Sequence, residues 1–185
     1  SRESIAREVD ALEDAPLASL DEAARLLVRR LDRSDQVGDQ VLVQPFTYAE
    51  TQFPSPFSRH FLRMIETLLS GRTVEQVRSA QPKSIDHVRE VARQSGAKTV
   101  LRGAYREVGD IVRVYALVVD IETGKRVSAA DVAIPKTLVV EENLDLRPQN
   151  FEEAQLDAGT LGEGEVLSGS LRLELWTDRG SESLL

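Results

Sequence analysis

Three consecutive segments rich in Val, Ile, Leu and Tyr constrain the fold of this chain more than any other feature. They cover residues 98–108, 111–121 and 125–134. Gly109 stands at the first junction and Gly124 at the second, and tight hairpin turns favour glycine because it adopts left-handed backbone conformations without steric cost. Strands joined by such short turns pair antiparallel with their neighbours. The segments therefore predict a three-stranded antiparallel meander.

The composition of these segments also predicts how the meander is placed. Within residues 111–121 only Arg113 and Asp120 are charged, so this strand is expected to be central and covered by helices on one face. Gly103 leaves the middle of the first strand without a side chain. A glycine there predicts either a bulge or a closely packed helix.

The residues before the meander show both helical and strand patterns. Ser19 and Glu22 have the spacing of a capping box, and the apolar stripe that follows runs to Leu31. A thinner stripe at Ile5, Val9 and Leu12 predicts an earlier helix. Further along, the sequence predicts a strand at 41–46, a helix opened by Ser55-Pro56 and stopped by Gly71, a short strand around 74–77, and a helix from Ser84 to Gly96. The fold class is therefore α+β, with N-terminal helices and a helix-packed mixed sheet that ends in the meander.

Composition divides the chain into four parts: N-terminal helices at 1–36, the α+β domain at 37–135, a linker at 136–169, and a final strand segment at 170–185. The linker holds eight acidic and two basic side chains, so it carries −6 of the chain's net charge of −8. Its apolar residues are sparse apart from Leu138-Val139-Val140, which predicts an extended, largely irregular acidic linker. Residues 171–176 alternate in the pattern of a half-buried strand, which either docks on the domain or begins a further β domain.

The chain has few of the cysteine and histidine side chains that most often act as nucleophiles or metal ligands. The chain has no cysteine, which excludes thiol catalysis and zinc–thiolate sites, and its two histidines, His60 and His87, fall on separate predicted helices. No glycine-rich phosphate loop, nucleophile elbow or calcium loop is present. We therefore expect no catalytic residues, no metal site, no cofactor and no enzymatic activity. The acidic charge disfavours nucleic acid as a partner, and no apolar run approaches the roughly 20 residues of a membrane span.

The candidate contact residues lie in a loop and in a strand. The polar loop at 47–54 contains Tyr48 and carries Phe53 at its tip, where the phenylalanine either docks on its own domain or anchors a partner. Asp131 lies within a predicted strand, where an acid must face solvent, pair with a cation or bind a partner. An exposed edge is the favoured interpretation, and an exposed sheet edge accepts an added strand. Phe53, Tyr48 and Asp131 are therefore the candidate protein-contact residues.

The meander also supports a family resemblance. The segments Ala97-Lys98-Thr99-Val100-Leu101-Arg102-Gly103-Ala104-Tyr105-Arg106, Gly109-Asp110-Ile111-Val112-Arg113-Val114 and Val118-Val119-Asp120-Ile121-Glu122-Thr123-Gly124-Lys125 resemble the FlgO-like and LpoB/CsgG-like bacterial envelope domains. The resemblance covers residues 37–134. Residues 171–180 resemble the first strand of a small β-sandwich domain of unknown function that often follows FlgO-like modules.

The resemblance implies a location and a kind of partner. Domains of this kind occur in the periplasm or at the outer membrane, often in lipoproteins, and act in assembly or regulation rather than as enzymes. It implies a protein-interaction module whose partner is another envelope protein, and association with further copies of the chain stays open. The alternative is a small-ligand or nucleotide sensor, because mixed sheets with helices bind ligands at strand ends. A passive spacer is a further alternative.

Overall fold

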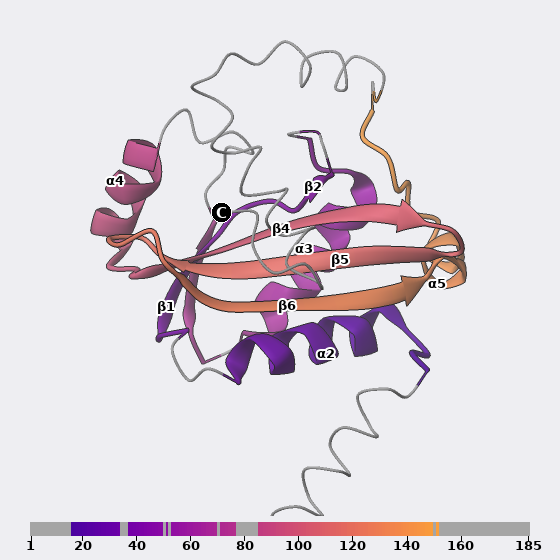
Figure 1. Cartoon of the computed structure of the whole chain (residues 1–185), viewed down its shortest axis with the longest axis horizontal. Coiled ribbons are helices and arrows are strands. Elements are labelled where there is room, and N and C mark those ends of the chain that lie inside the picture. Colours follow the sequence, from indigo (N-terminus) through magenta and orange to yellow (C-terminus); the bar gives the residue numbers. More distant parts are fainter. Residues whose placement is uncertain are drawn as a thin grey trace, which may run out of the picture.

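The computed structural model describes residues 16–33, 37–49, 51, 53–69, 71–76, 85–149 and 151. These residues form an α+β fold in which helices pack on a mixed sheet (Figure 1). The helices are α2 (Leu20–Asp32), α3 (Pro56–Leu68), α4 (Ile85–Ser95) and α5 (Lys136–Glu141). The strands are β1 (Gln40–Val43), β2 (Thr47–Tyr48), β3 (Thr73–Gln76), β4 (Thr99–Val108), β5 (Ile111–Asp120) and β6 (Arg126–Pro135). The predicted fold class is confirmed.

The C-terminal half of the sheet is the predicted meander. β4 pairs antiparallel with β5, and β5 pairs antiparallel with β6, so the apolar middle strand is flanked on both sides. Gly109 and Gly124 have φ angles of 58° and 69°, the left-handed conformations that the two turns require. The carboxylate of Asp120 fixes the second turn by accepting hydrogen bonds from the backbone N–H and the hydroxyl of Thr123.

The N-terminal half of the sheet is parallel. The strand order is β3-β1-β4-β5-β6, and β1 pairs parallel with both β3 and β4. β2 lies off this path and pairs parallel with β4 through Thr47 and Ala104 and through Tyr48 and Tyr105. The short strand predicted around residues 74–77 is thus confirmed as β3. Parallel neighbours need a crossover connection, and α3 and α4 lie in the two connections that follow β2 and β3.

Side-chain caps explain where two of the helices begin. Ser19 Oγ accepts a hydrogen bond from Glu22 N–H at 3.1 Å, while the Glu22 carboxylate reaches one residue further back and accepts from Ala18 N–H at 2.6 Å. At α3, Ser55 and Ser58 form a reciprocal capping box, and Pro56 occupies the first helical position. Both helix starts were predicted from the sequence.

The sheet has a large core on one face and a small one on the other. α2 and α3 cover the first face, and Figure 1 shows α2 running along β6. Phe57, Phe61 and Ile65 of α3 and Leu27 of α2 are buried there. α4 covers only one end of the second face, where Val88 and Ala92 pack on Leu42, Val100 and Ile121. β5 is therefore central and helix-covered on one face, as predicted.

Two local expectations are wrong. Gly103 lies at neither a bulge nor a helix contact, because β4 keeps its register with β5 and the ring of Phe46 packs directly on the glycine. Residues 47–54 do not form an irregular polar loop throughout. Thr47 and Tyr48 form β2, since the β1–α3 connection pairs its backbone with β4 and buries Thr47 and Thr51.

The acidic linker is also not irregular at its start. Lys136–Glu141 form α5, and Leu138 and Val139 are buried in the larger core. Leu138 and Val139, two residues of the apolar triplet, thus anchor this segment on the sheet. α2 and α5 share one core with residues 37–135. The predicted helix around Ile5 to Leu12, the linker beyond residue 151 and the strand at 171–176 lie outside the described residues.

Candidate functional site

Tyr48 connects β2 to several other segments. Its ring makes edge-to-face contacts with Tyr105 of β4, at 5.4 Å between centroids, and with Phe151, at 5.1 Å. Its hydroxyl donates a hydrogen bond to Glu107 Oε2 at 3.2 Å. Its backbone N–H donates to the carbonyl of Phe53, which closes the loop after β2. Burial and the negative charge of Glu107 raise the pKa of Tyr48, so its hydroxyl stays protonated at neutral pH.

Glu107 lies at the centre of a charged network at the end of β4. Its Oε1 lies 3.1 Å from Lys136 Nζ of α5, and its Oε2 lies 3.0 Å from Arg147 Nε. Burial raises the pKa of Glu107, but the hydrogen bonds from Arg147 and Lys136 and their positive charges outweigh it, so the net pKa is below the usual value. We call Tyr48, Glu107, Lys136 and Arg147 the Glu107 network. In this network the Glu107 carboxylate interacts with side chains from β2, α5 and the segment after α5, and so links them to β4.

A hydrogen bond from a buried tyrosine holds the segment after α5 in place. Tyr105 is fully buried, and its hydroxyl lies in hydrogen-bond contact with Ser55 Oγ and donates to the carbonyl of Leu146 at 2.8 Å. The backbone N–H of Phe57 donates to the carbonyl of Asp145 at 3.1 Å. The first turn of α3 and residues 144–147 are therefore fixed against each other.

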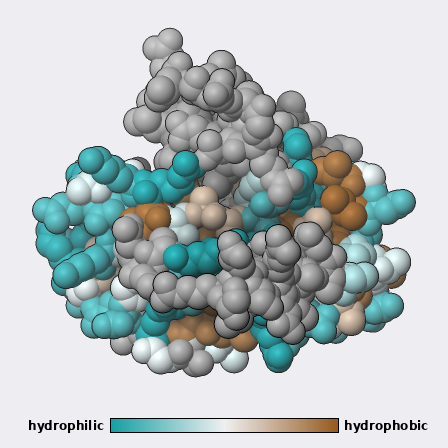
Figure 2. Space-filling model, turned by 60° about the horizontal axis from the view of Figure 1, so that its bottom comes forward, coloured by the Kyte–Doolittle hydropathy of each residue, from teal (hydrophilic) through white to brown (hydrophobic). Residues whose placement is uncertain are grey.

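Two of the three exposed large apolar side chains lie beside the Glu107 network. Phe53, Val108 and Val140 are 37%, 41% and 68% exposed, and they are the exposed large hydrophobic residues of the described part of the chain. Val140 lies one helical turn after Lys136, and the backbone carbonyl of Phe53 accepts a hydrogen bond from Tyr48 N–H. Val108 alternates with Glu107 along β4, so it lies on the other face of the strand. Figure 2 shows hydrophobic surface at the right-hand end, where Figure 1 places α5. We call Phe53 and Val140 together with the Glu107 network the turn-end surface.

Asp131 lies apart from Tyr48 and Phe53. β6 is an edge strand, as expected, but the Asp131 side chain is only 20% exposed and its Oδ2 lies 3.5 Å from Arg113 Nε. The expectation of a solvent-facing acid is therefore wrong, because the cross-strand neighbour supplies a cation. The backbone carbonyl of Asp131 also accepts a hydrogen bond from Arg30 Nη1 of α2 at 2.6 Å. The structure brings Tyr48 and Phe53 together and places Asp131 across β4 and β5 from them.

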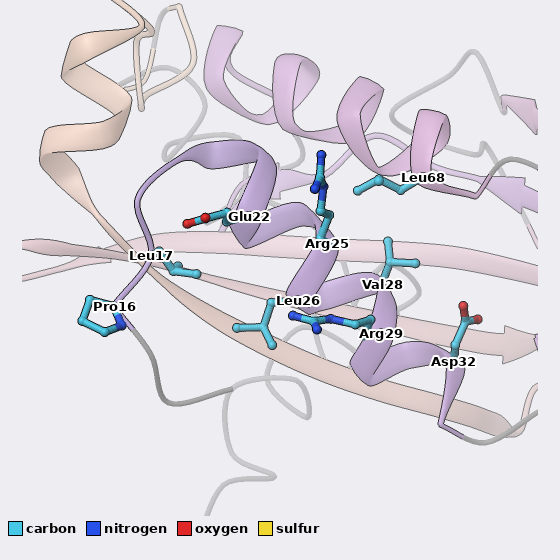
Figure 3. A pocket seen from close by; sticks show the side chains of 9 residues that line it. All are labelled: Pro16, Leu17, Glu22, Arg25, Leu26, Val28, Arg29, Asp32 and Leu68. Atoms are coloured by element: carbon cyan, nitrogen blue, oxygen red, sulfur yellow. The ribbon is translucent and has the colours of Figure 1, made fainter. Parts of the chain in front are cut away.

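A groove of about 600 Å³ runs along α2, and Leu68 of α3 contributes to its lining. Figure 3 shows Leu68 extending from α3 toward α2, with Arg25 and Arg29 along α2. Arg25 pairs with Asp21 on its own helix. Apolar walls with a charged rim and an open mouth suit a peptide or side chain better than an enclosed small molecule.

Within the described residues no group of three or more His, Asp or Glu side chains is placed to hold a metal ion. His60 lies on α3 and His87 on α4. None of the helices described is both long and apolar enough to cross a membrane.

Sequence patterns predicted Tyr48 and Phe53 but missed Glu107, Lys136 and Arg147. These three side chains come from β4, α5 and the segment after α5, and no spacing in the sequence relates them. The apolar triplet Leu138-Val139-Val140 was the one signal, because the burial of Leu138 and Val139 brings Lys136 to the sheet.

No protein-family description matches the chain, and no curated protein matches it. Among solved structures, the LpoB C-terminal domain from Salmonella enterica matches with a TM-score of 0.51 at 16% identity, over 63% of this chain and 98% of that one. The LpoB C-terminal domain from Escherichia coli matches with a TM-score of 0.50 at 16% identity, over 62% of this chain and 97% of that one. The FlgO-like part of the resemblance and the β-sandwich strand stay predictions. The described part of this chain has the fold of the LpoB C-terminal domains.

Proposed function

We propose that this chain is a non-catalytic protein-interaction module of a bacterial cell-envelope protein, exported to the periplasm or the outer membrane, and that its partner is another envelope protein. The likeness of its fold to LpoB C-terminal domains supports this proposal. Fold alone does not fix function, so the argument for binding depends on the surface.

The observation that carries the proposal is the turn-end surface. Protein interfaces combine apolar and aromatic contacts with a polar rim, and here Phe53 and Val140 flank a set of charged side chains. A single exposed valine needs no explanation, but here an exposed valine and an exposed phenylalanine lie beside the same ion-pair network. We propose that Tyr48 and Phe53 contact the partner.

The surface is also rigid before binding. Tyr48 is held by Tyr105, Phe151 and Glu107, and the segment that carries Arg147 is held by the Tyr105 hydroxyl. Binding to such a surface loses little side-chain and loop entropy, which leaves more of the contact free energy as affinity. Asp131 lies outside this surface.

The test is a pull-down from envelope extract with the full 185-residue chain and two variants. Val140→Glu places a charge in the turn-end surface at a largely exposed position, so it leaves the fold intact. Gln94→Glu adds the same charge on α4, which Figure 1 shows at the opposite end of the sheet. We expect Val140→Glu to lose a specific envelope protein that wild type and Gln94→Glu retain. Equal recovery by all three proteins contradicts the proposal.

A further inference from the structure

The sheet face opposite α2 and α3 carries a group of arginines. Arg102 and Arg106 of β4 alternate with Leu101 and Tyr105, which belong to the α2/α3 core, so both arginines lie on the other face. Arg106 is directly opposite Arg113 of β5. We call Arg102, Arg106 and Arg113 the arginine face. No described helix covers this group, since α4 packs at the end of the face marked by Val100 and Ile121.

The three strands of the meander place more positive than negative side chains on this face. Asp131 is the one carboxylate that β4, β5 and β6 place on this face, and it lies beside Arg113. Arg113 Nε is buried and makes no hydrogen bond within the described residues despite that ion pair. Like charges directly opposite each other, such as Arg106 and Arg113, destabilise a sheet.

Arg102 is the least compensated of the three arginines. The described part of the chain offers its guanidinium neither a hydrogen bond nor an ion pair, and burial lowers the pKa of Arg102. Arg102 is half-buried, and a partly desolvated cation gains from a carboxylate placed beside it.

A matching set of carboxylates follows in the same chain. Between residues 152 and 171 the sequence has five acids and no base: Glu152, Glu153, Asp157, Glu163 and Glu165. This segment begins directly after Phe151, whose ring contacts Tyr48, and Tyr48 pairs with Tyr105 on the strand that carries two of the arginines. β2 is only two residues long, and at roughly 3.3 Å per extended residue a short stretch of chain after Phe151 can pass β2 to reach the other face of β4.

We propose that the acidic segment 152–165 binds the arginine face of its own domain. Tethering gives this segment a high effective concentration at the face, which an unlinked acidic partner does not have. The overall charge of −8 also repels free polyanions such as nucleic acids. The arginine face is thus an internal docking surface, distinct from the turn-end surface.

Paramagnetic relaxation enhancement in the full chain tests the proposal. The chain has no cysteine, so Ala158→Cys gives one site for a nitroxide label beside Asp157. We expect the label to broaden the amide signals of β4 and β5 around Arg102, Arg106 and Arg113. Exchanging Glu152, Glu153 and Asp157 for Gln, Gln and Asn keeps the tether and the sheet intact, and it is expected to lower the enhancement about threefold or more, as the loss of several weak ion pairs predicts.

A second variant tests the same contact by changing the arginine face instead of the acidic segment. Arg106→Gln changes an exposed side chain and is expected to reduce the enhancement, while Arg59→Gln, an exposed arginine of α3, is expected to leave it unchanged. Enhancement that is absent in the labelled wild type, or unchanged when the acids are neutralised, overturns the proposal. Val140→Glu is expected to leave the enhancement unchanged, so the outcome of this experiment does not depend on the outcome of the pull-down.

Discussion

The ring of Phe46 lies against the backbone of Gly103 so closely that a Cβ at position 103 would lie 2.6 Å from three of its ring carbons. Phe46 is itself fully buried beneath β4. Gly103→Ala therefore forces the ring or the strand to move. We expect a loss of about 1–3 kcal/mol in the free energy of unfolding, measured by urea denaturation, because overpacking outweighs the small entropic gain from replacing glycine.

A double-mutant cycle separates this contact from a general effect on the strand. Phe46→Leu removes the ring, so Gly103→Ala should cost much less in that background. Equal costs in both backgrounds show that the ring is not what excludes a side chain at position 103.

The Glu107 network makes stability depend on pH. The folded-state pKa of Glu107 is below its ordinary value of 4.5. Its contribution to stability is therefore fully present above about pH 4.5 and is lost as the pH falls through the lower folded-state pKa. We expect the difference in unfolding free energy between wild type and Glu107→Gln to be largest near neutral pH and to shrink in acid. A difference that is constant from pH 7 to pH 3 shows that the carboxylate is not held by Lys136 and Arg147.

The Tyr105 hydroxyl is expected to stabilise the turn-end surface through the Leu146 carbonyl. Tyr105→Phe keeps the ring contacts with Tyr48 and Phe57 but leaves the carbonyl without this donor. We expect a loss of about 1–3 kcal/mol in the free energy of unfolding and faster amide exchange in residues 144–149. Unchanged exchange there shows that other contacts hold the segment.

The two helix caps differ in burial and should differ in cost. Ser55 is fully buried and joins the capping box to Tyr105, whereas the hydrogen bond from Glu22 N–H to Ser19 Oγ is exposed. We expect Ser55→Ala to cost about 2 kcal/mol and Ser19→Ala about 1 kcal/mol or less in chemical denaturation. A larger cost at Ser19 contradicts the assignment of the Ser55 hydroxyl to two structural roles.

Much of the fold follows from local sequence signals. Gly109 and Gly124 end strands whose residues favour extended structure, and Ser55-Pro56 begins a helix with its own cap and turn chemistry. These signals lie within a few residues of the elements they define, so they act before any tertiary contact forms. The meander and the helix starts can therefore be predicted without information about the tertiary packing.

The candidate site depends on contacts that are distant in sequence. Glu107 and Arg147 are 40 residues apart, and Tyr48 and Glu107 are 59 apart. No pattern in the sequence relates them, because their meeting depends on the burial of α5 and on the pairing of β2 with β4. Gly103 was expected to mark a bulge or a closely packed helix, and no sequence pattern indicates that the ring of Phe46 lies there instead.

The most direct test of the account is photo-cross-linking in cells of the source organism. A benzophenone amino acid replaces Phe53 in one variant of the full chain and Gln94 in another, and the cross-linked proteins are identified by mass spectrometry. The account predicts that position 53 captures one envelope protein reproducibly, that Val140→Glu abolishes this capture, and that position 94 does not capture it. Capture of that protein equally from both positions, or capture that Val140→Glu leaves unchanged, contradicts the claim that the turn-end surface binds the partner.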